Sequence, residues 1–247
     1  MLSYIILGII QGLTEFLPVS SSAHLILAQR LLGITEEALA ISVILHLGTL
    51  FALVIFFFRD IFELLVDKRT LFFVAVVTII TGAVAILGQD FFEKAFSSIK
   101  LVGLSLIITG AILILTNIFM QAKRSNLNFK DALLLGAVQG IAIIPGISRS
   151  GVTISTLLLR GVKRQAAFRI SFLAAIPAIC GAFILETKKI GYIFQAASGK
   201  LILGFIFSLL SGIFSLRLLK LVLERSRLHY FGYYCILVGV ITVIFLR

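Results

Sequence analysis

Two short polar segments interrupt an otherwise apolar sequence, and their residue types are those that bind and cleave phosphates. The first segment is Glu15-Phe-Leu-Pro-Val-Ser-Ser-Ser22, and His24 follows it. The second segment is Pro145-Gly-Ile-Ser-Arg-Ser-Gly151. An ionisable group at membrane depth costs roughly 2.5–3.5 kcal/mol on insertion scales, so groups of this kind are functional candidates by default.

The first segment combines an acid, hydroxyl groups and an imidazole. Glu15 can act as a general base or hold a divalent cation, Mg²⁺ or Ca²⁺, through a carboxylate oxygen. His24 can activate a serine or give a proton to a leaving group. The plainer interpretations are that one of the serines Ser20, Ser21 and Ser22 caps the following helix, and that His24 is buried and bonded to the backbone.

The second segment resembles an anion cradle. Arg149 offers a planar fork of donors that suits phosphate, and Ser148, Ser150 and Gly151 surround it at the start of a predicted helix. Backbone N–H groups and the dipole at a helix N-terminus favour a bound anion. The alternative is that Arg149 pairs with Glu15 and joins the two segments, and the two roles can coexist.

Two further residues are candidates for the lining of the same site. Thr153 adds a hydroxyl just after the second segment, and His46 lies on a predicted membrane span. His46 either lines the pocket or acts as a polar contact between helices.

The composition places this chemistry in a membrane. Of 247 residues, 60% are hydrophobic and 13% are charged, against about 25% charged in an average soluble domain. These values exclude a soluble globular enzyme and a disordered chain. The net charge of +11 comes from short loops between apolar runs. We attribute it to the excess of Lys and Arg that is typical of cytoplasmic loops in membrane proteins, and we expect no nucleic-acid partner.

The apolar runs predict an all-α polytopic membrane protein. A membrane-crossing helix needs about 20 apolar residues, and six runs meet or approach that length. They are Ile41–Phe58, Leu71–Gly88, Leu101–Met120, Phe168–Leu185, Leu201–Leu219 and Phe231–Leu246.

Four shorter apolar stretches flank the two polar segments. They are Tyr4–Thr14, Ala23–Leu32, Ala132–Ile144 and Val152–Arg160. We interpret each pair as a re-entrant helical hairpin that dips into the membrane and returns to the same side. Non-helical backbone is tolerated at that depth where it faces protein or a watery cavity.

The two hairpins predict an internal repeat within a single membrane domain, residues 1–247. Gln11-Gly12 pairs with Gln139-Gly140 at an offset of 128 residues, and the serine-rich turns pair at the same offset. Repeat one then covers about residues 1–122 and repeat two about residues 128–247. Each half is a hairpin followed by three spans, so the second half enters from the opposite face. Such inverted-topology repeats build their site near the bilayer midplane.

The loop charges predict the orientation. One side carries most of the lysines and arginines, and this side should be cytoplasmic. A multi-pass protein of the bacterial inner (plasma) membrane follows, with both termini outside.

The two segments resemble the paired motifs of the undecaprenyl-diphosphatase family, also called bacitracin-resistance proteins. The similarity also covers His46-Leu-Gly-Thr49 and the stretch from Phe168 to Pro177. It implies a membrane enzyme that removes one phosphate from a C55 polyprenyl diphosphate, recycles the lipid carrier for peptidoglycan synthesis and confers bacitracin resistance. It also implies an inverted-repeat fold, a divalent-cation requirement and homodimers in some members.

The resemblance assigns roles to particular residues. Glu15 is the acidic catalytic or metal residue, Ser21 the essential serine, His24 the histidine and Arg149 the phosphate-binding arginine. Where some members have a first glutamate, this chain has Gln11, which puts a two-carboxylate metal site in doubt. Gln11 can still offer its carbonyl to a cation or bond the phosphate.

One alternative function uses the same residues. Inverted repeats are also the architecture of alternating-access carriers, so a transporter or flippase of a phosphorylated lipid or a small anion remains a rival hypothesis.

Overall fold

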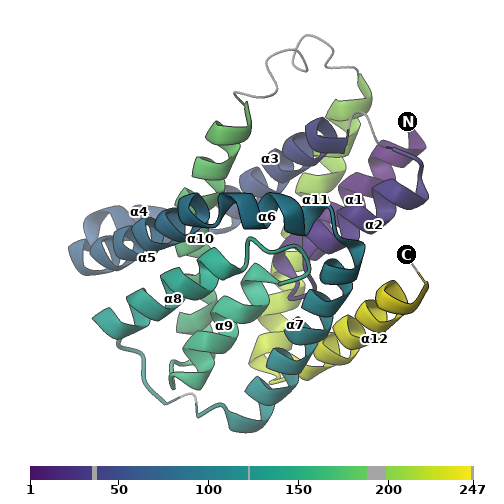
Figure 1. Cartoon of the computed structure of the whole chain (residues 1–247). Helices are drawn as coiled ribbons and strands as arrows, with labels where there is room; N and C mark the ends of the chain where they lie inside the picture. Colours follow the sequence, from purple (N-terminus) through teal and green to yellow (C-terminus); the bar gives the residue numbers. More distant parts are fainter. Residues whose placement is uncertain (35–37, 122, 188–198, 246–247) are drawn as a thin grey trace.

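The computed structural model describes residues 1–34, 38–121, 123–187 and 199–245. In these ranges the regular structure is helical, and a single isolated bridge pairs Arg124 with Val162. The helices are α1 (Leu2–Phe16), α2 (Ser21–Leu31), α3 (Ala38–Phe56), α4 (Phe58–Val66), α5 (Lys68–Leu87), α6 (Gln89–Phe96), α7 (Ile99–Phe119), α8 (Phe129–Ile141), α9 (Arg149–Leu159), α10 (Arg164–Thr187), α11 (Gly199–Glu224) and α12 (His229–Phe245) (Figure 1). The all-α prediction is therefore confirmed.

Four of the predicted spans are long and apolar enough to cross a membrane. They are α5, α7, α10 and α11, and α10 continues through Pro177. The predicted run Ile41–Phe58 corresponds to α3, which is followed by α4 at a bend of 70°. The last predicted run is α12, a shorter apolar helix of 17 residues, and its expected end at Leu246 lies outside the described residues.

Two short amphipathic helices, α4 and α6, were not predicted. Each places charged residues on one face and exposed phenylalanines on the other, with Phe58 and Phe62 on α4 and Phe91 on α6. A helix of this composition is suited to the membrane interface. Both are too short for a test based on spans of about 20 residues.

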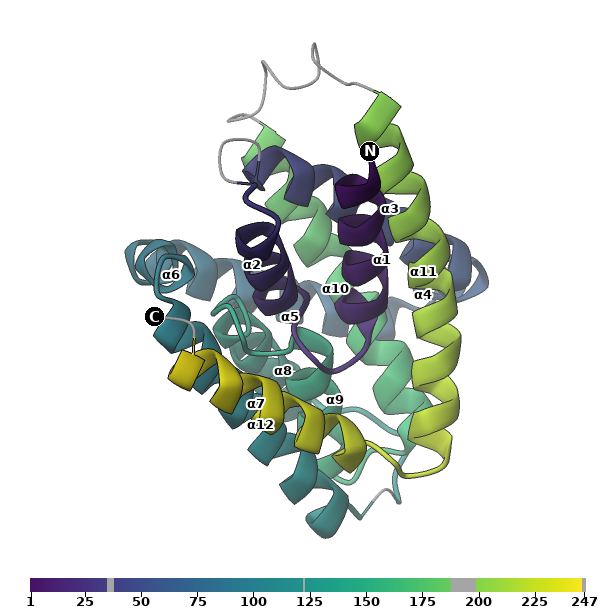
Figure 2. The same cartoon turned by 90° about the vertical axis from the view of Figure 1, so that its right-hand side faces the viewer.

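Both polar segments form the turns of helical hairpins, as predicted. α1 and α2 flank the first segment, and α8 and α9 flank the second. In Figure 2 the turn between α1 and α2 points down into the molecule toward α8 and α9. The two hairpins therefore bring their turns together from different directions.

Aromatic packing fixes the end of α1 that carries Glu15. The neighbouring Phe16 is fully buried and meets Phe172 of α10 edge to face, with ring centroids 5.6 Å apart. Phe172 also packs on Phe57 and Phe168. Since fully buried aromatic side chains dominate core energetics, this cluster fixes the rotation of α1 and hence the direction of Glu15.

A close helix contact joins α7 and α12. A Cβ atom built on Gly110 would lie 2.5 Å from the carbonyl oxygen of Gly232, and one built on Gly232 would lie 2.8 Å from the carbonyl oxygen of Gly110. Small residues that let two backbones approach are a common device in membrane helix packing.

Candidate active site

The two turns meet at a cavity of about 420 Å³. Its polar wall includes most of the residues predicted from the two segments, together with one from α3. They are Glu15, Ser20, Ser21, Ser22, His46, Ser148 and Arg149. Residues 134 positions apart in the chain thus share one buried site.

Glu15 is the centre of the polar contacts. Its side chain is 7% exposed, and its Oε1 lies 2.5 Å from Nη2 of Arg149. Its Oε2 accepts hydrogen bonds from Ser21 Oγ at 2.6 Å and from Gln11 Nε2 at 3.0 Å. The carboxylate is therefore held by groups from both hairpins.

Arg149 keeps donor capacity beyond this ion pair. Its Nη1 is buried and has no hydrogen-bond partner among the described residues. Ser148 is the N-cap of α9, and its Oγ accepts from the backbone N–H of Gly151 at 3.2 Å. Arg149 is the first residue of that helix, where an anion is favoured.

The turns also contact each other through the side chain of Ser20 and the backbone of Gly146. Ser20 has a φ of +67°, a left-handed conformation that is uncommon for a non-glycine residue. Its Oγ accepts a hydrogen bond from the N–H of Gly146 at 3.1 Å. Gly146 has a φ of +99°, and a Cβ atom there would lie 2.3 Å from the carbonyl oxygen of Val102. Strained backbone of this kind persists where the surrounding structure holds it.

His46 approaches Glu15 from α3. Its Nδ1 donates to the carbonyl oxygen of Ser42 at 2.7 Å, which leaves Nε2 facing Oε2 of Glu15 at 3.6 Å. His46 thus lies at the cavity wall, and its role in substrate binding stays a prediction.

His24, in contrast, does not line the cavity. Its Nδ1 donates to the carbonyl oxygen of Ser20 at 2.8 Å, and its Nε2 lies 2.7 Å from the hydroxyl of Tyr234 on α12. The two rings stack with centroids 5.6 Å apart. The catalytic role assigned to His24 stays a prediction, and its contacts are those of the buried, backbone-bonded histidine that was the alternative.

Four other predicted residues stand behind the cavity wall. Gln11 is fully buried and supports Glu15, and Ser150 donates to the carbonyl oxygen of Leu17 at 3.3 Å. Thr153 donates to the carbonyl oxygen of Arg149 at 2.7 Å. Gly151 is buried against the first turn, where a Cβ atom would lie 3.2 Å from Pro18.

Gln139 is a cavity residue that the sequence analysis did not assign to the site. It is 3% exposed, and its Nε2 donates to Thr81 Oγ1 at 3.2 Å and to the carbonyl oxygen of Ala174 at 3.3 Å. Its Oε1 has no partner in the described part of the chain. The signal was present, because Gln139 is the repeat counterpart of Gln11.

The donors of the cavity do not make a complete cation site. Among the described residues no group of three His, Cys, Asp or Glu side chains could hold a metal ion. In the part of the chain that the structure describes, Glu15 is the one carboxylate that lines the cavity, and both of its oxygens already accept contacts from Arg149 and Ser21. Ca²⁺ takes six to eight oxygen ligands, so these residues alone do not complete a Ca²⁺ site, and Mg²⁺ would need waters or substrate phosphates as further ligands.

The fold and the cavity define a class: a multi-pass membrane protein with a buried cavity, lined by Glu15 and Arg149, between two helix–turn–helix segments. Residues 4–241 match the family described as "Bacitracin resistance protein BacA". The chain belongs to this family.

Relatives resemble the chain over nearly its whole length. A protein of Halothermothrix orenii named undecaprenyl-diphosphatase is 44% identical, over 97% of this chain and 96% of its own. A protein of the same name from Methanosphaera stadtmanae is 40% identical, over 98% of this chain and 97% of its own. "Undecaprenyl-diphosphatase 2" of Bacillus thuringiensis is 35% identical, over 99% and 97% respectively.

Proposed function

We propose that this chain is an integral membrane phosphatase that hydrolyses undecaprenyl diphosphate to undecaprenyl phosphate and inorganic phosphate. This reaction recycles the lipid carrier for peptidoglycan synthesis and confers resistance to bacitracin. The names of the relatives and the family description agree with it. The observation that carries it is the contact of Glu15 with Arg149 in a cavity that also has an apolar wall.

Arg149 binds the terminal phosphate in this proposal. Its buried Nη1 lacks a partner among the described residues and can donate to a phosphate oxygen without breaking an existing bond. Charge-assisted bonds from a guanidinium to phosphate are among the strong hydrogen bonds. When Nη2 also turns to the phosphate, Glu15 is released and becomes free to accept a proton.

Ser21 is the nucleophile that the geometry favours. Its Oγ–H donates to Oε2 of Glu15 at 2.6 Å, which is within the range for a general base and its nucleophile. As Oγ bonds to the terminal phosphorus, its proton passes to Glu15 and the bond from phosphorus to the bridging oxygen breaks. The lipid monophosphate leaves, and water then attacks the phosphoserine, which releases phosphate and restores Ser21.

The divalent cation enters the proposal only as a partner of the substrate. We propose that Mg²⁺ or Ca²⁺ takes most of its ligands from the diphosphate, with Glu15 as its protein carboxylate, because the cavity donors alone do not complete a site. None of the steps above depends on it. Phosphate release measured with chelator and with a series of metals tests this point.

The inverted repeat is supported by the helix contacts. In the repeat, α1, α3, α5 and α7 correspond to α8, α10, α11 and α12. α1 and α3 of the first half pack on α11 of the second half, and their counterparts α8 and α10 pack on α5 of the first half. The counterparts α7 and α12 pack on each other. Gln11 donates to Thr49 of α3, and Gln139 donates to the backbone of α10, the equivalent helix. A two-fold relation between residues 1–122 and 128–247 explains all of these pairings.

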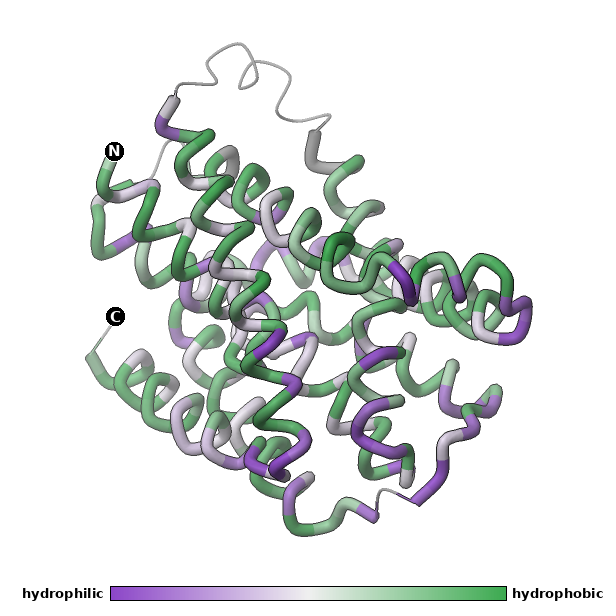
Figure 3. The backbone as a smooth tube through the Cα atoms, turned by 180° about the vertical axis from the view of Figure 1, so that it is seen from behind, coloured by the Kyte–Doolittle hydropathy of each residue, from purple (hydrophilic) through white to green (hydrophobic). Residues whose placement is uncertain are grey.

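The proposed location is the bacterial plasma membrane, with both termini outside. Figure 3 shows hydrophilic colour on loops at the right and lower edges, whereas the N-terminus and the described end of α12 lie at the left. This agrees with a basic cytoplasmic side away from the termini. A homodimer is proposed from the family resemblance alone.

The proposal is tested with the purified protein in detergent. Arg149→Ala should lower phosphate release from undecaprenyl diphosphate by roughly 10²–10³-fold, the cost of removing one oxyanion donor. Glu15→Ala should lower it by roughly 10²–10⁴-fold, the usual contribution of a general base. Arg149→Lys should remain strongly impaired, because an ammonium cannot bridge Glu15 and phosphate as a fork does. Turnover at the wild-type rate in either alanine variant would reject these roles.

A carrier with no phosphatase activity is distinguished by the same assay. It would move lipid phosphate between leaflets of a vesicle without releasing phosphate. Trapping of phosphoserine at Ser21 by acid quench, absent in Ser21→Ala, separates a serine nucleophile from direct attack by water.

A further inference from the structure

The cavity has an apolar part that the phosphate chemistry leaves unused. Its walls come from the C-terminal halves of α5 and α10. The residues that face it are Gly82, Ala85 and Ile86 on α5 and Ala178, Gly181 and Ala182 on α10. We call this part the α5–α10 slot.

Two glycines of the slot have no packing reason to be glycine. A Cβ atom built on Gly82 or on Gly181 would meet no heavy atom within 4 Å. In contrast, a Cβ atom on Gly140 of α8 would lie 2.5 Å from Val84, so that glycine is required by helix contact. Glycine within a helix costs about 1 kcal/mol relative to alanine. Gly82 is half-buried and Gly181 is exposed, so both border open space that a molecule from outside the chain can occupy.

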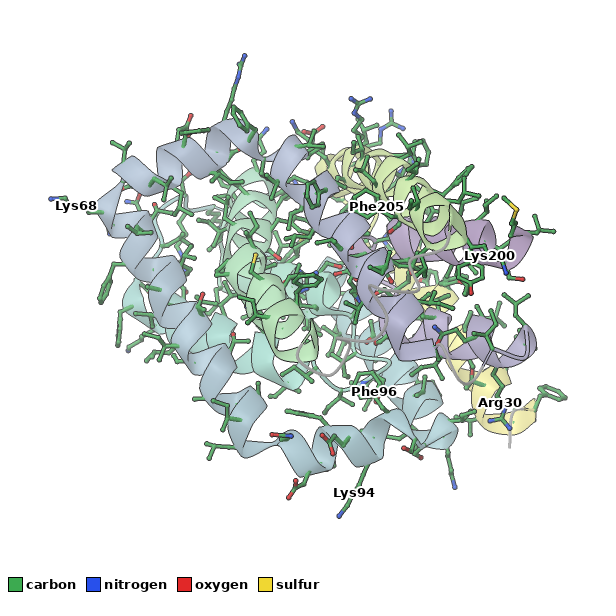
Figure 4. The ribbon with its side chains drawn as sticks, turned by 90° about the horizontal axis from the view of Figure 1, so that it is seen from above. Arg30, Lys68, Lys94, Phe96, Lys200 and Phe205 are labelled. Carbon is green, nitrogen blue, oxygen red and sulfur yellow. The ribbon has the colours of Figure 1, made fainter. Side chains whose placement is uncertain are left out.

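The slot connects the buried phosphate site with the outer surface of the helix bundle. Ser148 at the inner end is 2% exposed, whereas the rim residues Ile86 and Phe96 are 74% and 46% exposed. In Figure 4 α5 and α6 form an arc around α10, and Phe96 lies on the inner side of α6 while Lys94 points away from it. The slot thus reaches the surface of the helix bundle beside α6.

A second observation also points to a bound molecule in this cavity. Gln139 lines it and is 3% exposed, yet its Oε1 has no hydrogen-bond partner in the part of the chain that the structure describes. Buried polar atoms are normally satisfied. The Oε1 atom needs a donor, so an ordered water or the polar end of a bound molecule would satisfy it, whereas an apolar chain in the slot would not.

We propose that the α5–α10 slot holds the first isoprene units of the substrate chain, and that Gly82 and Gly181 set the width available to their methyl branches. The inference rests on the proposed function. A chain bonded to a diphosphate at Arg149 must leave through some part of the same cavity, and the slot is its apolar, surface-reaching part. Gly82 and Gly181 are then specificity-determining residues for a branched polyprenyl chain.

Gly82→Leu and Gly181→Leu test the proposal, because each fills the slot while raising helix propensity. Two quantities are measured in detergent: kcat/KM for undecaprenyl diphosphate and for farnesyl diphosphate, and the inhibition constant of inorganic pyrophosphate, which probes the phosphate site alone. We expect kcat/KM to fall roughly tenfold or more for both lipids, since a misfit of one or two carbons in an apolar pocket is worth about 10–200-fold. The pyrophosphate constant should stay within about twofold of the wild-type value.

Ala83→Leu is the matched control, because Ala83 is the neighbouring small residue on α5, is exposed and does not line the cavity. It should leave all of these quantities near wild type. Unchanged lipid turnover in both glycine variants, or an equal loss of pyrophosphate binding, would overturn the slot. A wild-type protein that releases no phosphate from undecaprenyl diphosphate would instead overturn the proposed function.

Discussion

At the scale of single residues, the sequence left two roles open for Arg149, and the geometry accommodates both. Nη2 pairs with Glu15, as the packing interpretation predicted, while Nη1 stays without a partner among the described residues, as anion binding requires. Residue types and repeat spacing were enough to predict this pair. They could not predict that His24 turns to Tyr234, because that contact joins residues 210 positions apart and depends on how α12 packs.

The contacts of His24 lead to a prediction about its role. Nδ1–H of His24 donates to the carbonyl oxygen of Ser20. An asparagine at position 24 can place its side-chain amide N–H near the same oxygen. We expect His24→Ala to lower kcat/KM by about fivefold, the effect of one hydrogen bond of about 1 kcal/mol that holds the Ser20 turn. His24→Asn should recover most of that loss, with the pH dependence of kcat unchanged. If both substitutions lowered kcat/KM equally and removed one limb of the pH dependence of kcat, His24 would be shown to transfer protons instead.

At the scale of elements, close approach of α7 and α12 is a condition of the fold. Even a single Cβ atom at position 110 would lie 2.5 Å from the carbonyl oxygen of Gly232. Gly110→Val adds two further carbons at this position. Overpacking of a well-packed contact costs about 1–3 kcal/mol, so the melting temperature in detergent should drop by several degrees. Ala111→Val places the same side chain at an exposed neighbouring position, and its melting temperature should match the wild type. A drop of equal size in both variants would mean that valine itself, and not the helix contact, is responsible.

Asp131 anchors the entry of the second hairpin, and its charge predicts a pH dependence. It accepts hydrogen bonds from Arg124 at 2.8 Å and from Arg160 at 3.0 Å. Burial raises the pKa of Asp131, but the hydrogen bonds from Arg124, the Asn128 backbone and Arg160 outweigh it and hold the pKa below the usual value. A lowered carboxyl pKa means that the stabilisation is present at neutral pH and is lost as the pH falls through the folded-state pKa.

Asp131→Asn should therefore lower the thermal stability at pH 7 and leave two guanidinium groups without their anion. The difference from wild type should shrink only as the pH falls through the lowered folded-state pKa of Asp131, since the wild-type carboxyl is then protonated as well. Asp90→Asn, at an exposed position on α6, is the control and should be neutral throughout. A stability difference for Asp131→Asn that does not change with pH would contradict the electrostatic explanation.

At the scale of the whole molecule, apolar run lengths and the paired Gln-Gly and serine motifs predicted most of the architecture. The hairpins and four spans follow from those signals, because hydrophobic length is a direct requirement of the bilayer. The bend of 70° after α3 and the interfacial helix α6 do not follow from them. In these places tertiary packing, and not run length, decides where a helix ends.

The orientation of the whole chain supplies the final prediction, and it separates hairpins from true spans. With Cys180 and Cys235 replaced by alanine, single cysteines are introduced at Leu2 and Leu31, which are 70% and 76% exposed at the two ends of the first hairpin. Because a re-entrant hairpin returns to its own side, a membrane-impermeant thiol reagent should label both positions in intact cells. A cysteine at Lys130 or Lys163, at the ends of the second hairpin, should react only after the membrane is permeabilised, as the basic loops require. If Leu2→Cys and Leu31→Cys were labelled from opposite sides, the hairpin would be a span, the second half would not be inverted, and the two turns could not meet from opposite faces.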